Sequence, residues 1–341
     1  ISRRNEANTK FIVLEPNEGE KTISFGTSTN SGNATVSDIT KWHLYTGTYD
    51  GSYWRIYVDG EKQSTSSLSQ ITFDDTDFGS ILIGKDDLIT ATSTDNRFFD
   101  GSIDDVRIYN QALTDEEVQE LYASYGLKLH AKFDGNLNNS SYINSNTLSF
   151  FEGSVESKPR YENGFDEREN GSIIFDGQNQ FIKINTAITG LKSIGFWIYP
   201  TVNNRGVIKL TSSINVSINA SSKLVLASFT SPTIYINGVK DVDGSTSLTS
   251  IKSNVWHYIT ITTGTAITTQ ANSQLGNKGA TDSTNASDYF KGRIDEVRIY
   301  DMTLTANSVR NIYNSYTKNK TILKQLYLDG ETTSVNSYLH N

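Results

Sequence analysis

The chain of 341 residues contains no cysteine, one methionine and four prolines. Without cysteine, neither disulfides nor thiolate-bound metals are available to it. No apolar run approaches the roughly 20 residues that a membrane-spanning helix needs, so we expect no insertion into a membrane. The net charge is -8, so the chain lacks the excess of Lys and Arg that nucleic-acid binding draws on. These absences favour a neutral or weakly charged partner.

The composition that remains is typical of a β protein. Hydrophobic residues make up 36% of the chain and aromatic residues 11%, alongside abundant Ser, Thr, Asn and Gly. Such a composition suits short strands that are joined by polar turns better than it suits helices. We therefore expect an all-β fold.

A ten-residue phrase occurs twice, as GSIDDVRIYN at 101–110 and GRIDEVRIYD at 292–301. Without gaps, positions 98–125 and 289–316 share about 14 identities in 28 positions, which is a true internal repeat. A helix signal follows each copy. In the first, Thr114 and Glu117 form a capping box and Gly126 terminates the helix, whereas the second lacks the acidic residue. Each module is thus predicted to close with one strand and one short helix.

The repeat divides the chain into two modules. LKLHAKFDG follows Gly126 directly and alternates as a strand, so we expect a complete β-sandwich at 127–317. The first module, 1–126, has no counterpart of LKLHAKFDG or of SIGFWIYP. We therefore expect its N-terminal half to be absent from this chain and the polypeptide to extend upstream. Residues 318–341 form a tail or the start of a further element.

The acid inside the repeated phrase is a candidate ligand. Strict alternation predicts that Asp295 shares the core-facing side of its strand with Val297 and Ile299. A buried carboxylate needs compensation, either from backbone N–H groups of a turn or from a cation. Ca²⁺ takes six to eight oxygens, which Asp295 and the turn around Asp134 could supply together. Both alternatives stay open, and Asp104, the matching acid of module one, is the weaker candidate.

Aromatic residues opposite the core face are candidates for stacking on sugars. In SIGFWIYP, Trp197 and Tyr199 lie opposite the apolar side of the strand. In GSYWRIYVDG, Tyr53 and Tyr57 do the same. The alternative is that both faces of each sheet are covered and that these four rings are packing residues.

Several motifs resemble the laminin-G-like, concanavalin A-like lectin/glucanase superfamily. They are the Trp-His at a strand start, the hairpin YVDG, and IDDVRIY or IDEVRIY followed by ALT or TLT. The resemblance implies tandem jelly-roll sandwiches of two curved antiparallel sheets, with carbohydrate bound on the concave face or rim. It also implies calcium, because related glucanases place an Asp of a similar strand at a calcium ion.

Glycanases of this superfamily display an acid pair through Glu-x-Asp-x-Glu on one strand, and the sequence has no such string. The densest acidic stretch, ENGFDERE at 162–169, has the wrong spacing, and its Gly and Asn favour a loop. The sequence therefore predicts a protein that is not an enzyme.

The leading hypothesis is a non-catalytic, lectin-like module of an extracellular or virion-surface protein, such as a phage tail fibre, that contacts cell-surface glycans. A second hypothesis is a structural or assembly module whose partners are further copies of itself or virion neighbours. A third is the accessory domain of a secreted polysaccharide-degrading enzyme.

Overall fold

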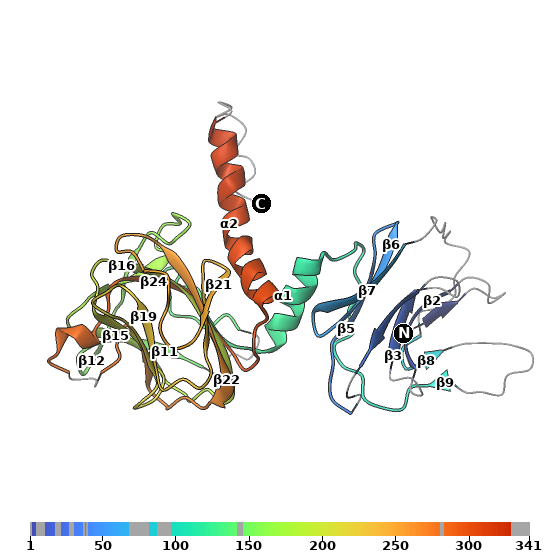
Figure 1. Ribbon diagram of the computed structural model, residues 1–341, viewed down its shortest axis with the longest axis horizontal. Coiled ribbons are helices and arrows are strands. Elements are labelled where there is room, and N and C mark those ends of the chain that lie inside the picture. Colours follow the sequence, from blue (N-terminus) through green and yellow to red (C-terminus); the bar gives the residue numbers. More distant parts are fainter. Residues whose placement is uncertain are drawn as a thin grey trace, which may run out of the picture. The chain divides into compact units, whose positions relative to one another are not determined.

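The protein is all-β, as predicted (Figure 1). The computed structural model describes residues 2–4, 11–17, 22–26, 31–36, 38, 40–67, 82–86, 97–141, 146–279 and 283–328. The chain divides into two compact units, unit 1 (Ile1–Tyr122) and unit 2 (Ala123–Asn341).

Unit 2 is a sandwich of two antiparallel sheets. The first, the β24 sheet, has the order β13-β14-β24-β16-β22-β20-β21, and β10 also pairs with β24. Its strands are β10 (Leu127–Ala131), β13 (Arg160–Glu162), β14 (Ser172–Asp176), β16 (Leu191–Pro200), β20 (Thr233–Ile236), β21 (Val239–Asp243), β22 (His257–Ile267) and β24 (Lys291–Tyr300). The second, the β15 sheet, has the order β12-β11-β15-β23-β17-β18-β19. Its strands are β11 (Leu148–Glu152), β12 (Val155–Ser157), β15 (Gln180–Ile184), β17 (Arg205–Lys209), β18 (Asn215–Ile218), β19 (Leu224–Ala227) and β23 (Ser273–Leu275). A short 3-10 helix, Ala286–Asp288, precedes β24.

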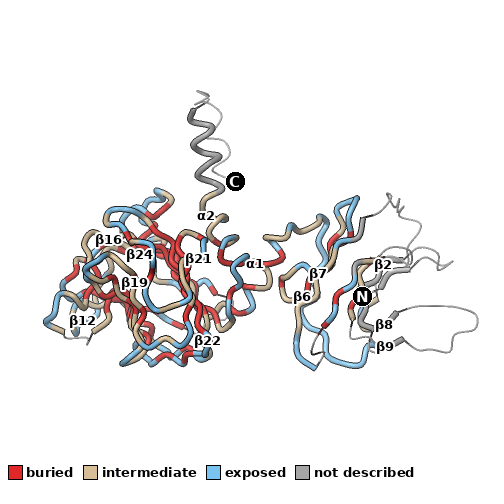
Figure 2. The backbone as a smooth tube through the Cα atoms, in the orientation of Figure 1, coloured by how far each residue is buried: buried red, intermediate tan, exposed pale blue. Residues whose placement is uncertain are grey.

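The core of unit 2 lies between these sheets, where Figure 2 shows the buried residues gathered. The alternation of SIGFWIYP places Ile194, Phe196 and Ile198 in this core, which confirms the prediction for that strand. Each such side chain contributes about 1.5–3 kcal/mol when it is fully buried.

A second apolar cluster covers the outer face of the β24 sheet. Trp197 and Tyr300 project from that face and pack with Val309 and Ile312 of helix α2 (Ala306–Leu328). The helix therefore buries one part of the outer face, and both faces of the sheet are covered there.

The helices begin as predicted. For α1 (Asp115–Tyr125), the backbone N–H of Thr114 donates to the carboxylate of Glu117, and the backbone N–H of Glu117 donates to Oγ1 of Thr114. The helix α1 ends before Gly126, whereas α2 continues to Leu328 and is longer than predicted. Its residue at the matching position is Thr317, which does not terminate a helix as glycine does. No helix among the described residues is long and apolar enough to cross a membrane.

Unit 1 contains three smaller antiparallel sheets among its described residues, β1-β2-β3-β4, β5-β6-β7 and β8-β9. Their strands are β1 (Ser2–Arg4), β2 (Phe11–Asn17), β3 (Thr22–Gly26), β4 (Ser31–Thr35), β5 (Tyr45–Tyr49), β6 (Tyr53–Val58), β7 (Glu61–Ser67), β8 (Lys85–Asp86) and β9 (Arg97–Phe98). A small core joins Ile23, Ala34 and Val36 to Ile56 and Val58.

The two copies of the repeated phrase differ in structure. The second copy is strand β24, as predicted, but residues 101–110 form no strand, so the prediction for the first copy is wrong. In unit 2, β24 pairs with β10, β14 and β16. No described strand of unit 1 takes the place of these three, and an extended segment without such partners gains no ladder hydrogen bonds.

Candidate functional site

Strand β24 carries a β-bulge that reverses the expected position of Asp295. Glu296 has a φ of 49°, and the pairing of β24 with β16 shifts register between Gly195 and Trp197. Asp295 lies directly opposite Trp197, and opposite residues of antiparallel strands share a face. The carboxylate therefore lies on the outer face with Trp197, and the prediction that it shares the side of Val297 and Ile299 is wrong. Strict alternation fails because the bulge adds one residue to the strand.

Asp295 is nonetheless buried, with an exposed fraction of 1%. Its Oδ2 accepts a hydrogen bond from the backbone N–H of Phe165 at 3.3 Å, and its Oδ1 has no hydrogen-bond partner among the described residues. Burial, reinforced by the nearby Glu296 carboxylate, raises the pKa of Asp295 to about 9. At neutral pH this side chain is therefore a neutral acid.

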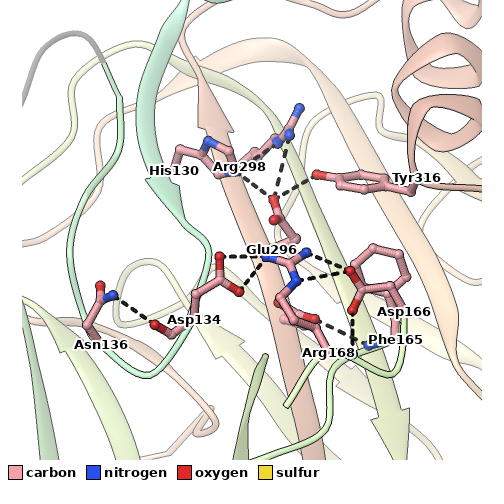
Figure 3. A network of polar contacts seen from close by, with 10 residues as sticks. His130, Asp134, Asn136, Phe165, Asp166, Arg168, Glu296, Arg298 and Tyr316 are labelled. Atoms are coloured by element: carbon pink, nitrogen blue, oxygen red, sulfur yellow. Dashed lines mark hydrogen bonds and ion pairs between the residues drawn. The ribbon is translucent and has the colours of Figure 1, made fainter. Parts of the chain in front are cut away.

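Asp134 lies in the turn that follows β10 and is held by an arginine of the loop between β13 and β14. Nη1 of Arg168 donates to both oxygens of Asp134 at 2.7 and 2.6 Å, while Nη2 donates to Asp166 at 2.6 Å (Figure 3). The stretch ENGFDERE thus forms a loop after its first residue, as predicted, and its arginine clamps two acids.

A second group of polar side chains meets at Glu296, which the sequence reasoning missed. Nε2 of His130, from β10, lies 2.6 Å from Oε2 of Glu296, and the hydroxyl of Tyr316, from α2, donates to the same oxygen at 2.9 Å (Figure 3). Nη2 of Arg298 lies 3.6 Å from Oε2 of Glu296, and the guanidinium lies over the ring of Tyr316. These contacts fasten α2 to the β24 sheet. The sequence did contain a signal for this group. Both copies of the repeated phrase have two adjacent acids, which break the alternation of polar and apolar residues expected of a strand.

The pKa values of this group follow from burial and pairing. Burial lowers the pKa of His130, so its ring is neutral near pH 7. Burial alone would raise the pKa of Glu296, but the hydrogen bond from His130 and the charge of Arg298 outweigh it and hold this pKa below its usual value. Glu296 is therefore a paired carboxylate, unlike its neighbour Asp295.

The predicted calcium site can be compared with these side chains. Among the described residues, no three His, Cys, Asp or Glu side chains form a group that could hold a metal ion. Asp295 offers one oxygen without a partner, but both oxygens of Asp134 are engaged by Arg168. The arrangement fits a guanidinium better than Ca²⁺, so calcium at Asp295 and Asp134 stays a prediction that this geometry does not favour.

Asp104, the third predicted ligand, is exposed. Its carboxylate accepts a hydrogen bond from the backbone N–H of Asp105, its own neighbour in the chain. The side chain is not buried in unit 1 because residues 101–110 are not built into a sheet, so the reason for a compensating cation is missing there.

Two of the four predicted sugar-stacking residues are buried. Trp197 stacks on Phe165, with 4.3 Å between ring centroids and 3° between planes, and meets Tyr316 edge to face. Tyr57 is buried, and its hydroxyl donates to Asp115 of α1 at 2.7 Å. Neither ring has a face open to a ligand. Trp197 and Tyr57 are therefore packing residues, which was the alternative that the sequence left open.

Tyr53 and Tyr199 keep exposed surface. The guanidinium of Arg55 lies 5.2 Å from the ring centroid of Tyr53. The guanidinium of Arg293 lies 4.9 Å from the ring centroid of Tyr199, and the ring centroid of Trp256 lies 5.4 Å from the same centroid. Each predicted tyrosine thus lies beside an arginine that the sequence reasoning did not select.

Tyr199 belongs to a row of side chains across the outer face of the β24 sheet. Register pairs Arg160 with Ile174, Ile174 with Arg293, and Arg293 with Tyr199, so all four share that face. Ring contact adds Trp256. Every member is half-buried or exposed. The row, Arg160–Ile174–Arg293–Tyr199–Trp256, is named the aromatic–arginine row below.

Solved structures with similar folds come from several proteins. Domain 4 of AbnA, an extracellular GH43 arabinanase of Geobacillus stearothermophilus in complex with arabinotriose, is 19% identical, with a TM-score of 0.33 and coverage of 55% of this chain and 98% of that chain. The binding domain of Paraclostridial Mosquitocidal Protein 1 is 18% identical, with a TM-score of 0.39 and coverage of 57% and 53%. Botulinum neurotoxin type C, whose cell entry is dependent upon interaction with two ganglioside molecules, is 15% identical, with a TM-score of 0.36 and coverage of 58% and 53%. This chain thus spans about half the length of the last two.

No curated protein matches the sequence. Residues 2–119, which lie in unit 1, match the family model described as the concanavalin A-like lectin/glucanases superfamily. This match confirms the resemblance that the motifs predicted.

Proposed function

We propose that the protein is a non-catalytic carbohydrate-binding module of an extracellular or virion-surface protein, and that unit 2 contacts a cell-surface glycan through the aromatic–arginine row. The family match covers unit 1. It extends to unit 2 through the internal repeat, because positions 98–119 of the matched range align with the closing strand and helix of unit 2.

The aromatic–arginine row is the observation that carries this proposal. Tyr and Trp rings offer apolar faces on which sugar rings stack, with a polar edge that stays in water. Arginine offers several N–H donors in a fixed plane for hydroxyl or carboxylate oxygens. Both chemistries meet at Tyr199, because Arg293 lies 4.9 Å and Trp256 5.4 Å from the centroid of its ring.

The acids of unit 2 described above support a non-catalytic role. Glycosidases need one carboxyl group as acid and a second as nucleophile or base, both facing the substrate. Here Asp134 and Asp166 share Arg168, while Asp295 and Glu296 are buried under the outer cluster. None of these four is presented to a ligand as part of such a pair.

The test is a glycan array probed with the intact chain, its Tyr199→Ala variant and its Tyr53→Ala variant. Wild type should bind at least one class of glycan, and Tyr199→Ala should weaken that binding about tenfold, which corresponds to about 1.4 kcal/mol. Tyr53→Ala is the matched control, because it removes the exposed tyrosine beside an arginine in unit 1. Loss with Tyr53→Ala but not with Tyr199→Ala would contradict the assignment to unit 2.

A further inference from the structure

The two arginines of the aromatic–arginine row have no carboxylate partner among the described residues. The guanidinium of Arg293 donates one hydrogen bond, from Nη1 to the backbone carbonyl of Asn163 at 3.2 Å. Arg160 is exposed and forms no ion pair within the described part of the chain. The sequence contains 38 Asp and Glu residues against 30 Lys and Arg residues, so acids that could pair with arginines are plentiful. The row nonetheless keeps two positive charges without a partner.

Two acids lie on the same face, one on each side of the row. In register, Asp176 lies directly opposite Lys291, and Glu162 lies directly opposite Ser172. Lys291 therefore balances the charge of Asp176. Glu162 forms no ion pair with either arginine of the row in the region that the structure describes. The acids of this face thus leave both arginines available to a ligand.

Two other arginines lie over tyrosine rings, and each of them also has a carboxylate. Arg55 lies 5.2 Å from the ring centroid of Tyr53, and its Nη1 donates to the carboxylate of Asp50 at 2.6 Å. Arg298 lies 5.1 Å from the ring centroid of a tyrosine of α2, and its Nη2 lies 3.6 Å from the carboxylate of Glu296. The row contains the same stack of guanidinium and ring without the acid, so a place for one carboxylate is left open.

Two contacts hold the guanidinium of Arg293 in position. The ring of Tyr199 lies under the cation, with 4.9 Å between the guanidinium carbon and the ring centroid, and the carbonyl of Asn163 holds Nη1. The remaining N–H groups, on Nη2 and Nε, have no partner among the described residues. Parallel N–H groups of a guanidinium match the two oxygens of a carboxylate, and a guanidinium that is already oriented loses less freedom on binding.

The rest of the row extends this site on both sides. Arg160 lies two strands away from Arg293 on the same face, about 10 Å by strand spacing, so its charge adds attraction for an anion. On the other side, Trp256 offers a ring. The backbone N–H of Asn254 donates to the carbonyl of Pro200 at 2.7 Å, which brings an exposed amide side chain to the same end. The row therefore has a cationic end and an end of ring and amide groups.

We propose that the saccharide bound by the aromatic–arginine row carries a carboxylate, and that Arg293 holds this acidic sugar residue through two parallel hydrogen bonds. The inference rests on the proposed function, because it names the class of saccharide that the same site takes. A carboxylate is the group that Asp50 and Glu296 place beside the arginines of the other two stacks. The neighbouring sugar residue packs against Trp256. One acidic residue in an otherwise neutral glycan is a weakly charged partner, which the composition of the chain favours.

The test compares acidic saccharides with their carboxyl-reduced counterparts, in which the carboxylate is replaced by a hydroxymethyl group and the ring is unchanged. Oligogalacturonides, oligoglucuronides and sialyllactose are titrated into the intact chain by calorimetry, each beside its reduced form, and sulfated lactose is included as a different anion. At least one acidic saccharide should bind at least about tenfold more tightly than its reduced form. Raising the salt concentration from about 50 mM to about 500 mM should weaken only the acidic member of that pair.

Substitutions assign the preference to one side chain. Arg293→Gln removes the charge, so it should weaken binding of the acidic saccharide at least about tenfold and leave binding of the reduced form unchanged. Arg293→Lys should restore only part of the preference, because an ammonium group cannot form two parallel hydrogen bonds. The matched control is Arg55→Gln, at an arginine that also lies over a tyrosine but is already paired with Asp50. It should leave both affinities unchanged.

The outcomes distinguish this inference from the proposed function. Equal affinity for the acidic and reduced forms would overturn the inference and leave glycan binding by the row in place. Binding of sulfated lactose alone, or a preference for the acidic form that Arg293→Gln retains, would overturn it as well. If no saccharide binds, neutral or acidic, the proposed function is contradicted together with the inference.

Discussion

At the residue scale, neighbouring acids of one strand have opposite ionisation because their partners differ. Glu296 faces His130 and Tyr316, and the pairing keeps it charged. Asp295 accepts from the backbone N–H of Phe165 and lies among aromatic rings, and burial raises its pKa to about 9, so it stays protonated at neutral pH. The bulge at Glu296 produces this difference, because it lets two consecutive acids project from the outer side of the sheet.

The raised pKa of Asp295 predicts a pH dependence of stability. The folded chain holds a proton that the unfolded chain releases above its ordinary pKa of 3.8, so the free energy of unfolding should fall as pH rises toward 9. The expected slope is about 1.4 kcal/mol per pH unit between pH 5 and pH 8. In urea titrations across this range, Asp295→Asn should flatten the decline. Asp104→Asn, at the exposed matching position, should leave the decline intact, and identical slopes in wild type and Asp295→Asn would contradict the account.

The clamp at Arg168 predicts that calcium is dispensable. Because Arg168 already neutralises Asp134 and Asp166, removing divalent cations with a chelator should change the melting temperature by less than about 1 °C. Arg168→Ala should cost roughly 1 kcal/mol, since these pairs are partly exposed. A melting temperature that falls by several degrees in chelator and recovers with added Ca²⁺ would instead support the calcium site predicted from the sequence.

At the element scale, local patterns predicted the elements that depend on local chemistry. The capping box of α1 and the alternation of β16 were read correctly, because each depends on residues close in sequence. The bulge in β24 could not be predicted, because it depends on how β24 meets β16. The sequence left open whether Trp197 is buried, because the residues that cover it, in α2 and at Phe165, lie far along the chain. The loop arginine Arg168 was missed for the same reason.

In each unit a glycine packs against a tyrosine of the closing helix, so substitutions of these two glycines should have similar effects on stability. Gly60 and Gly238 have φ values of 78° and 76°, and a methyl group on either would press on a tyrosine of the following helix. Gly60→Ala and Gly238→Ala should each destabilise the chain by about 1–2 kcal/mol, through backbone strain and displacement of the helix. The control is Gly244→Ala, where φ is not positive and the nearest atom lies at 3.6 Å. Denaturant midpoints check this prediction. Equal midpoints for Gly238→Ala and Gly244→Ala would contradict the claim that the glycine is needed for the packing of the closing helix.

At the scale of the whole molecule, the two units present different surfaces. Unit 2 is a finished sandwich whose outer face is partly sealed by α2 and partly open at the aromatic–arginine row. Unit 1 carries the same closing phrase without strands beside it among its described residues. We therefore expect glycan binding to map to unit 2, so that substitutions at exposed positions of unit 1 leave it unchanged.

The central claim is that unit 2 binds a saccharide without cleaving it. The most direct measurement is calorimetric titration of the intact chain with the best glycan found on an array, followed by mass spectrometry of the same saccharide after prolonged incubation. The account predicts saturable binding that Tyr199→Ala or Arg293→Ala weakens about tenfold, with the saccharide recovered intact. A saccharide that is shortened during incubation, or binding that both substitutions leave unchanged, would contradict it.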